Sequence, residues 1–219
     1  MTIMDIGANE GLFSLIFKTL QPNCLIYAFE PAPKSFKRFR INISLNNFSN
    51  IIIEKSCLGS YEGSTKFYNF QGPMSGLSSL RPPSNMILAP IKVISVPITT
   101  IDCYVKRKKI ENLDFIKIDV EGGELDVLKG GVDSIKKINP IIMSEIQDLR
   151  TKNWNYKAFE IYQFLKLLNY NWYKITEKGF LKEVSLNKKD NIDYENLVAI
   201  PQDKENTIND LLLLKRTDK

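Results

Sequence analysis

The stretch Met4-Asp5-Ile6-Gly7-Ala8-Asn9-Glu10-Gly11 predicts an apolar strand that turns through glycine residues into a helix. Gly7 and Gly11 have no side chain, so the backbone of this turn can approach a ligand closely. A second buried strand is expected from Cys24 to Phe29, and Glu30 follows at its carboxyl end. Ligands of open α/β sheets bind at this end of the strands, where an acid can accept both ribose hydroxyls. The two segments together therefore predict a nucleoside-binding site.

The spacing of the turn separates this site from a dinucleotide site. The pattern is D-x-G-x-N-x-G rather than G-x-G-x-x-G, with Asp5 before the first glycine. An acid there would repel a pyrophosphate but suits a cationic amino-acid group. S-adenosylmethionine carries such a group together with a ribose and a sulfonium. Asp5 and Asn9 can also be read as turn-forming residues only, because both types favour turns.

Composition is typical of one globular domain. The chain has 219 residues, 43% hydrophobic and 25% charged, with a formal net charge of +5. No stretch reaches the roughly 20 apolar residues of a membrane-spanning helix. The run Lys106 to Lys109 is interpreted as a solvated helix end, so no nucleic-acid partner is expected. The modest positive net charge is compatible with anionic substrates. The first strand begins almost at Met1, which is compatible with a shortened version of a longer protein.

Cysteine and histidine usage limits the chemistry. Cys24, Cys57 and Cys103 are far apart, without a C-x-x-C motif, and are typical of a reducing cytoplasm. The sequence contains no histidine. Its absence excludes Ser-His-Asp and Cys-His catalysis and every zinc site built on histidine. A general base must be Asp, Glu, Lys, Tyr or Cys.

Alternating strands and helices predict a doubly wound, mostly parallel sheet. One domain is expected over residues 1–200, with an antiparallel hairpin or flap inserted at about 60–97, and a C-terminal tail over 201–219. The last two strands should form an antiparallel edge hairpin, and the tail should be helical. Pro82 to Ile87 can be read either as part of a lid or as a linker. The expected helices are 12–20, with Leu12, Leu15, Ile16 and Leu20 at helical spacing, 33–47, 98–108, 125–130 and 156–168; the expected strands are 50–54, 64–70, 91–96, 113–119, 141–145, 170–175 and 194–200.

Acidic residues close two of the later strands. Asp119 and Glu145 should meet Asp5 and Glu30 at one edge of the sheet. Lys117 can either neutralise these acids or act as a base with a lowered pKa. Glu121 and Glu124 follow in the turn, where Glu124 is interpreted as a favourable charge at a helix N-terminus.

The motifs together resemble those of FkbM-type methyltransferases over roughly residues 3 to 147. The resemblance implies a class I fold, Rossmann-like and seven-stranded, that uses S-adenosylmethionine and methylates hydroxyl groups of sugars, polyketides and related natural products. Two departures are the start of the chain at the first motif and the lack of the histidines that are frequent in the family. The motifs are Asp5 to Gly11, Phe29-Glu30-Pro31, Leu45-Asn46, Ser75 to Leu80, Ile101-Asp102, Ile116 to Gly122, Glu124, Leu128-Lys129-Gly130 and Glu145.

The residue roles that follow are expectations. Catalysis, an in-line transfer assisted by positioning, is assigned to Asp119, Glu121 and Lys117. Ser75, Ser78 and Glu145 are expected to contact the acceptor. A magnesium ion shared by Asp119 and Glu145 is a further hypothesis. The expected cofactor-binding residues are Asp5, Gly7, Ala8, Asn9, Gly11, Glu30, Ser56, Cys57 and Asp119.

Three other functions stay open. The first is an NAD(P)-dependent oxidoreductase, disfavoured by the acidic first turn, and the second is a non-catalytic cofactor-binding module. The third is an RNA methyltransferase, for which no aromatic and basic stripe is present. The acceptor is not identified by the sequence, although loops 59–97 and 153–179 should shape its pocket. Trp172 is interpreted as core, whereas Trp154 can be core or sugar-stacking.

Overall fold

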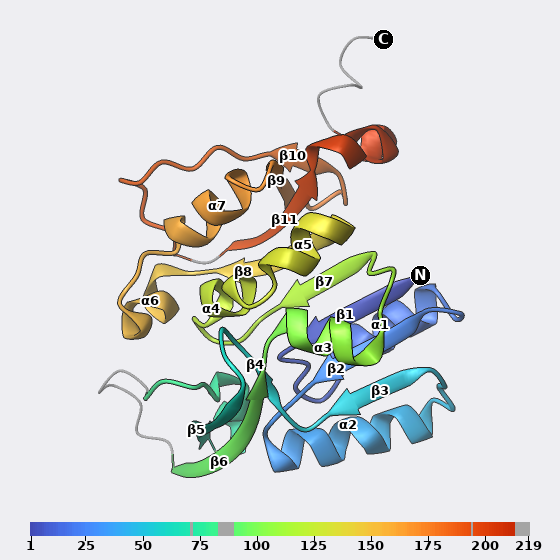
Figure 1. Cartoon of the computed structure of the whole chain (residues 1–219), viewed down its shortest axis with the longest axis vertical. Helices are drawn as coiled ribbons and strands as arrows, with labels where there is room; N and C mark the ends of the chain where they lie inside the picture. The colour runs from blue at the N-terminus through green and yellow to red at the C-terminus, as the bar shows by residue number, and fades with distance from the viewer. Residues whose placement is uncertain (71, 83–89, 194, 213–219) are drawn as a thin grey trace.

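A mixed sheet forms the centre of the computed structural model, which describes residues 1–70, 72–82, 90–193 and 195–212 (Figure 1). The strand order is β10-β9-β11-β8-β7-β1-β2-β3. Strands β3, β2, β1, β7 and β8 run parallel, whereas β11 is antiparallel to β8 and β9. The bounds are β1 Thr2–Ile6, β2 Leu25–Phe29, β3 Ile51–Glu54, β7 Phe115–Ile118, β8 Ile141–Ile146, β9 Tyr170–Ile175, β10 Leu181–Glu183 and β11 Glu195–Pro201.

The doubly wound parallel architecture is confirmed, but the expected number of seven strands is wrong. The sheet has eight strands among the described residues, because the three-residue β10 pairs antiparallel with β9 at the edge. The expected C-terminal pair β9 and β11 is present, although it is covered on one side by β10. A strand of three residues carries too little hydrophobic alternation to be recognised in the sequence.

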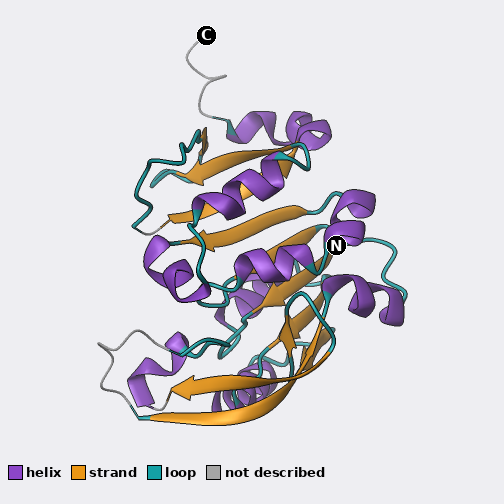
Figure 2. Ribbon diagram, turned by 60° about the vertical axis from the view of Figure 1, so that its left-hand side comes forward, coloured by secondary structure: helices purple, strands orange, loops and turns teal. Residues whose placement is uncertain are grey.

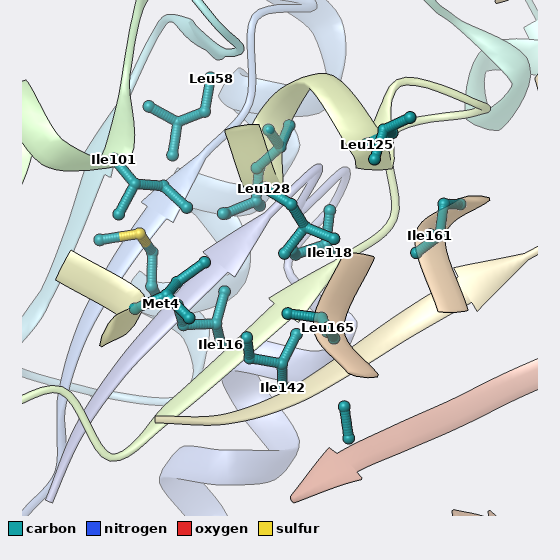
Figure 3. Packing of buried hydrophobic residues seen from close by; sticks show 14 of the residues in the cluster. Met4, Leu58, Ile101, Ile116, Ile118, Leu125, Leu128, Ile142, Ile161 and Leu165 are labelled. Carbon is teal, nitrogen blue, oxygen red and sulfur yellow. The ribbon is translucent and has the colours of Figure 1, made fainter. Parts of the chain in front are cut away.

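Helices cover both faces of the sheet (Figure 2). Met4 and Ile6 face one side and belong to a buried cluster that also contains Ile101, Leu128 and Leu165. Figure 3 shows Met4 in this cluster with Ile101 and Leu128 near it. Alternate residues of the strands face the other side, where Ile3 and Ile26 contact the cluster around Phe39. The bounds are α1 Leu12–Leu20, α2 Pro33–Leu45, α3 Ile101–Lys108, α4 Glu124–Lys129, α5 Val132–Ile138, α6 Asp148–Thr151 and α7 Phe159–Lys166.

Helix α1 has the expected bounds but not the expected buried face. Leu12 and Leu20 are 66% and 70% exposed, and Ile16 is also exposed. Ser14 and Lys18 are buried instead. The Ser14 hydroxyl donates to Asp5, and Lys18 Nζ donates to the carbonyl of Cys24, so both polar groups are satisfied. The buried face of this helix therefore includes polar side chains that hydrogen-bond to β1 and to the residue that precedes β2.

The inserted flap contains the expected antiparallel hairpin. β5 (Gly63–Phe70) pairs with β6 (Ile91–Thr99), and the short β4 (Cys57–Leu58) adds a parallel strand to β6. A 3₁₀ helix, η1 (Gly72–Leu77), follows β5. Because β6 extends to Thr99, helix α3 begins at Ile101 rather than at Ile98. Most of the stretch from Pro82 to Ile87 lies outside the described residues.

The described part of the tail is a 3₁₀ helix, η3 (Gln202–Leu211), rather than the expected α-helix. Residues 213–219 lie outside the description. The core position of Trp172 is confirmed, since its side chain is fully buried and its indole N–H donates to the carbonyl of Tyr162. Among the described residues, no helix has the length and apolar character needed to cross a membrane.

Gly11 tests the packing beneath the first turn. It has a φ of +88°, and a Cβ there would lie 2.0 Å from the Phe39 ring. We expect Gly11→Ala to lower the free energy of unfolding by about 3 kcal/mol, from left-handed backbone strain and overpacking. Urea denaturation measures the change.

Gly179→Ala is the matched control, because Gly179 has a φ of +77° with no neighbouring atom within 4 Å. It should cost about 1 kcal/mol, from backbone strain alone. Equal losses in the two variants would show that packing against Phe39 contributes nothing.

Candidate functional site

A cavity of about 380 Å³ opens at the carboxyl ends of the parallel strands, between the sheet and the flap. Its wall contains residues from the turns after β1, β2, β3 and β7 and from the end of β8, as expected for an α/β sheet. The predicted site residues in the wall are Gly7, Asn9, Glu30, Ser56, Cys57, Ser75, Ser78, Asp119, Glu121 and Glu145. The predicted residues that do not line it are Asp5, Ala8, Gly11 and Lys117.

The turn after β1 approaches the turn after β7 very closely. Gly7 has a φ of +79°, and a Cβ there would lie 1.8 Å from the carbonyl oxygen of Asp119. Asn9 also has a positive φ, of +51°. Its Oδ1 atom is buried without a hydrogen-bond partner among the described residues. The turn therefore presents a free polar acceptor at the cavity wall.

Asp5, expected from the sequence to contact a cofactor, does not line the cavity. It shares a sheet face with Ile3 and points toward α1, where it is fully buried. Its Oδ2 accepts a 2.6 Å hydrogen bond from Ser14, and its Oδ1 lies 3.6 Å from Lys117 Nζ. Asp5 therefore stabilises the turn after β1 through its contacts with Ser14 and Lys117. Ala8 and Gly11 are likewise packed against the α2 side, near Phe39.

Glu30 joins the first two turns. Its Oε2 accepts from the backbone N–H of Asn9 at 2.8 Å, and its Oε1 accepts from that of Ala32 at 2.7 Å. Burial raises the pKa of this carboxyl to about 7, although the two N–H groups act against that shift. Ser56 and Cys57 continue the same wall after β3, and burial raises the pKa of the Cys57 thiol.

Three carboxylates gather at the ends of β7 and β8. Asp119, Glu121 and Glu145 each offer an oxygen within 4.8 Å of the others, a group that could hold a metal ion. Burial raises the pKa of Glu145, and the nearby charges of Asp119 and Glu121 raise it further. Burial also raises the pKa of Glu121 to about 7, opposed by Arg150, whose Nε lies 2.9 Å from its Oε2. The carboxyl groups of Glu121 and Glu145 therefore keep their protons to a higher pH than ordinary glutamates.

Lys117 is not a base with a lowered pKa. Burial alone would lower the pKa of Lys117, but the carboxylates of Asp5 and Asp119 outweigh burial and raise it. Its Nζ lies 3.1 Å from Asp119 and 3.5 Å from the carbonyl oxygen of Gly7. Lys117 thus neutralises the acids and connects the turns after β1 and β7.

The turn from Val120 to Gly123 is held in an unusual backbone conformation. Glu121 has a φ of +58°, which is uncommon for a residue with a side chain. The buried Glu124 accepts from the backbone N–H groups of Val120 and Gly122, at 3.0 and 3.2 Å. The hydroxyl of Tyr156 donates to the carbonyl of Gly122. Glu124 thus fixes the turn rather than only placing charge at a helix end.

The flap contacts this same turn. Ser79 Oγ donates to the carbonyl oxygen of Glu121 at 3.2 Å. Ser78 lines the cavity, but its hydroxyl accepts from the N–H of Phe70 and donates to the carbonyl of Ser75, so it mainly stabilises the flap. The structure therefore places the flap over the cavity, with its hydrogen bonds directed to the acidic turn.

Two of the wall residues that were not predicted as site residues contact each other. Trp154, in the short 3₁₀ helix η2 (Lys152–Trp154), lines the cavity, which answers the open choice in favour of a wall position. Arg81 lines it from the flap, and its guanidinium lies over the Trp154 ring, 5.0 Å from the centroid. The only sequence signal was the position of both residues in loops expected to shape the acceptor pocket.

The comparisons with known proteins find a methyltransferase family model and methyltransferase relatives. A family model described as the methyltransferase FkbM domain matches residues 5–172. Methyltransferase 1 of Beauveria bassiana is 32% identical over 143 residues, or 58% of this chain and 57% of that protein. The 2-O-methyltransferase NoeI of Sinorhizobium fredii is 28% identical over 158 residues, or 67% of this chain and 63% of that protein. The chain thus spans little more than half the length of these relatives.

A solved structure shows the same fold. The crystal structure of methyltransferase FkbM from Methylobacillus flagellatus KT covers 90% of this chain with a TM-score of 0.54 and 15% identity. The match includes 43% of that longer chain.

The raised pKa values of the glutamates predict how stability varies with pH. Glu30, Glu121 and Glu124 have pKa values of about 7, compared with an ordinary value of 4.5. Between these values the folded chain keeps protons that the unfolded chain has released, so the free energy of unfolding should fall as pH rises through this window. Urea denaturation at pH 5 to 8 measures the slope.

Glu124→Gln is the informative variant, since its amide oxygen can still accept from the turn. It should make the decrease shallower, because one titrating group is removed. A stability that rises from pH 5 to 7 would contradict the assignment.

Proposed function

The chain belongs to the FkbM methyltransferase family, and we propose that it transfers a methyl group from S-adenosylmethionine to a hydroxyl group of a sugar, glycan or related natural product. The observation that carries this proposal is one cavity whose wall joins the glycine turn, Glu30 and the acids after β7 and β8. The relative NoeI, a 2-O-methyltransferase, supports oxygen as the acceptor atom. Residues 1–200 are proposed to act as one domain with the flap as an insertion and 201–219 as a tail.

The residues of the cavity fit a cationic nucleoside. Glu30, Asp119, Glu121, Asp126 and Glu145 give the wall an acidic character that complements a sulfonium and an ammonium group. The free Oδ1 of Asn9 is a ready acceptor for an ammonium N–H. When bound, the cofactor supplies a methyl group made electrophilic by the positively charged sulfur.

Each side of the cavity then has a separate task. Gly7 and Asn9 would hold the amino-acid part of the cofactor, and Glu30 would hold the ribose. Ser56 and Cys57 would contact the adenine. Ser75 and Ser78, in the flap, exclude water over the acceptor, so that the acceptor oxygen is held for in-line attack.

Glu121 is assigned to take the proton of the acceptor hydroxyl. It lines the cavity, and its pKa of about 7 suits a general base at neutral pH. Arg150 stabilises its ionised form. Asp119, held by Lys117, would contribute negative charge near the reacting methyl group, and Glu145 belongs to the same cluster of carboxylates. Nothing in the family match calls for the magnesium ion expected from the sequence, and the proposed step uses none.

Cofactor binding is the first test. Calorimetric titration with S-adenosylmethionine, S-adenosylhomocysteine and NADH should show binding of the first two only. Glu30→Gln should weaken that binding by about tenfold or more, the effect of losing a charged hydrogen bond. Thermal unfolding of the variant checks that the turn is still folded.

Glu10→Gln is the control, because Glu10 lies in the same turn but outside the cavity wall. It should change the affinity by less than about twofold. Binding of NADH alone would support the oxidoreductase alternative, and binding of no nucleotide would support a non-catalytic module.

The pH dependence of transfer tests the base. Formation of S-adenosylhomocysteine with a panel of glycosides should fall as pH decreases below about 7, because Glu121 then carries a proton. Glu121→Gln should lower the rate by about 100-fold or more without loss of cofactor binding. The exposed Glu111→Gln should retain the rate.

Activity measured in the presence of a chelator tests the magnesium hypothesis. Full activity in the chelator would exclude a magnesium ion on Asp119 and Glu145, whereas loss of activity restored by Mg²⁺ would require one.

For the test of the base, unchanged activity in Glu121→Gln would contradict the role of Glu121 and assign the role of base to another carboxylate.

A further inference from the structure

Arg81 is the one cation that lines the cavity in the described part of the chain. The titratable acids of the wall are Glu30, Asp119, Glu121, Asp126 and Glu145. The other nearby cations, Lys117 and Arg150, are ion-paired with acids and lie outside the wall. Arg81 lies on the flap side, where the cavity is shaped by η1 and the residues after it. A single positive charge thus lies at the acceptor side of an acidic cavity.

The guanidinium of Arg81 is oriented by an aromatic ring. It lies over Trp154, 5.0 Å from the ring centroid. Trp154 is fixed by a 3.3 Å hydrogen bond from its indole N–H to the carbonyl of Glu121. The ring also packs against Gly122 and Gly123, where an added Cβ would lie 2.8 Å from ring atoms. The acidic turn therefore fixes the ring on which Arg81 lies.

This arrangement leaves Arg81 able to bind an anion. A guanidinium that lies on an aromatic face keeps its N–H donors at its edge, where they match a carboxylate or a phosphate. The side chain is exposed, and no ion pair of Arg81 is present among the described residues. The flap segment 75–80 lines the cavity, and Arg81 follows it directly and lines the cavity as well.

We infer that the acceptor is acidic, with an anionic group that Arg81 binds while a neighbouring hydroxyl lies at Glu121. The distance that separates the two contacts is set by Trp154, which touches both Arg81 and the backbone of Glu121. Arg81 is a specificity-determining residue in this arrangement, since it recognises the charge and takes no part in proton transfer. This inference rests on the proposed function of the same cavity.

Binding of matched methyl glycosides tests the inference. The methyl glycoside of glucuronic acid, methyl glucoside and methyl glucoside 6-phosphate are titrated into the chain, with and without S-adenosylhomocysteine. We expect at least one of the two anions to bind about tenfold more tightly than the neutral glucoside. The glucuronide and phosphate arms distinguish a carboxylate from a phosphate as the recognised group.

Two variants separate recognition from general charge. Arg81→Gln should reduce the preference for the anion to less than about twofold, whereas Lys92→Gln should keep it. Lys92 is exposed on β6 of the same flap and does not line the cavity. Arg81→Lys keeps the charge without the planar guanidinium and should retain only part of the preference.

Different results would overturn the inference about Arg81 and the proposed function. Equal affinity of all three glycosides, a preference that persists in Arg81→Gln, or equal loss in Lys92→Gln would each overturn the inference. Failure of S-adenosylhomocysteine to bind would instead overturn the proposed function, because the preference for an anion is also measured without it. Unchanged S-adenosylhomocysteine affinity in Arg81→Gln shows that the cofactor half of the cavity is intact.

Discussion

The close approach of two turns determines the geometry of the whole site. Gly7 lies against the carbonyl of Asp119 at a distance that leaves no room for a side chain. Lys117 lies beneath this contact and binds both Asp5 and Asp119, the acids on either side of it. The pairing of β1 with β7 aligns Asp5 directly with Lys117. Backbone packing and one buried charge network thus bring the cofactor half and the acidic half together.

Much of the fold could be predicted because local patterns determine it. The alternation of apolar strands with helices identified the parallel sheet, and the break in that alternation identified the flap. The face of α1 could not be predicted, since Ser14 and Lys18 are buried by hydrogen bonds to Asp5 and Cys24. Such contacts depend on the sheet around the helix, whereas hydrophobic spacing reflects the helix alone.

The residues that meet at the site could also be predicted from the order of the strands. Gly7, Asn9, Glu30, Asp119, Glu121 and Glu145 meet because the carboxyl ends of parallel strands share one edge. The direction of a side chain is harder to predict from the sequence: Asp5 accepts a hydrogen bond from Ser14 of α1 and does not line the cavity. Arg81 and Trp154 come from segments 73 residues apart, and no local motif joins them.

The carbonyl oxygen of Glu121 accepts from both Ser79 of the flap and Trp154 of η2. Two segments that are distant in the sequence therefore share a single acceptor, on a residue whose backbone is already constrained. Substitutions in the two segments should consequently be epistatic, because each donor alters the geometry available to the other. A flap grafted from a relative would carry its specificity only if the matching tryptophan segment were transferred with it.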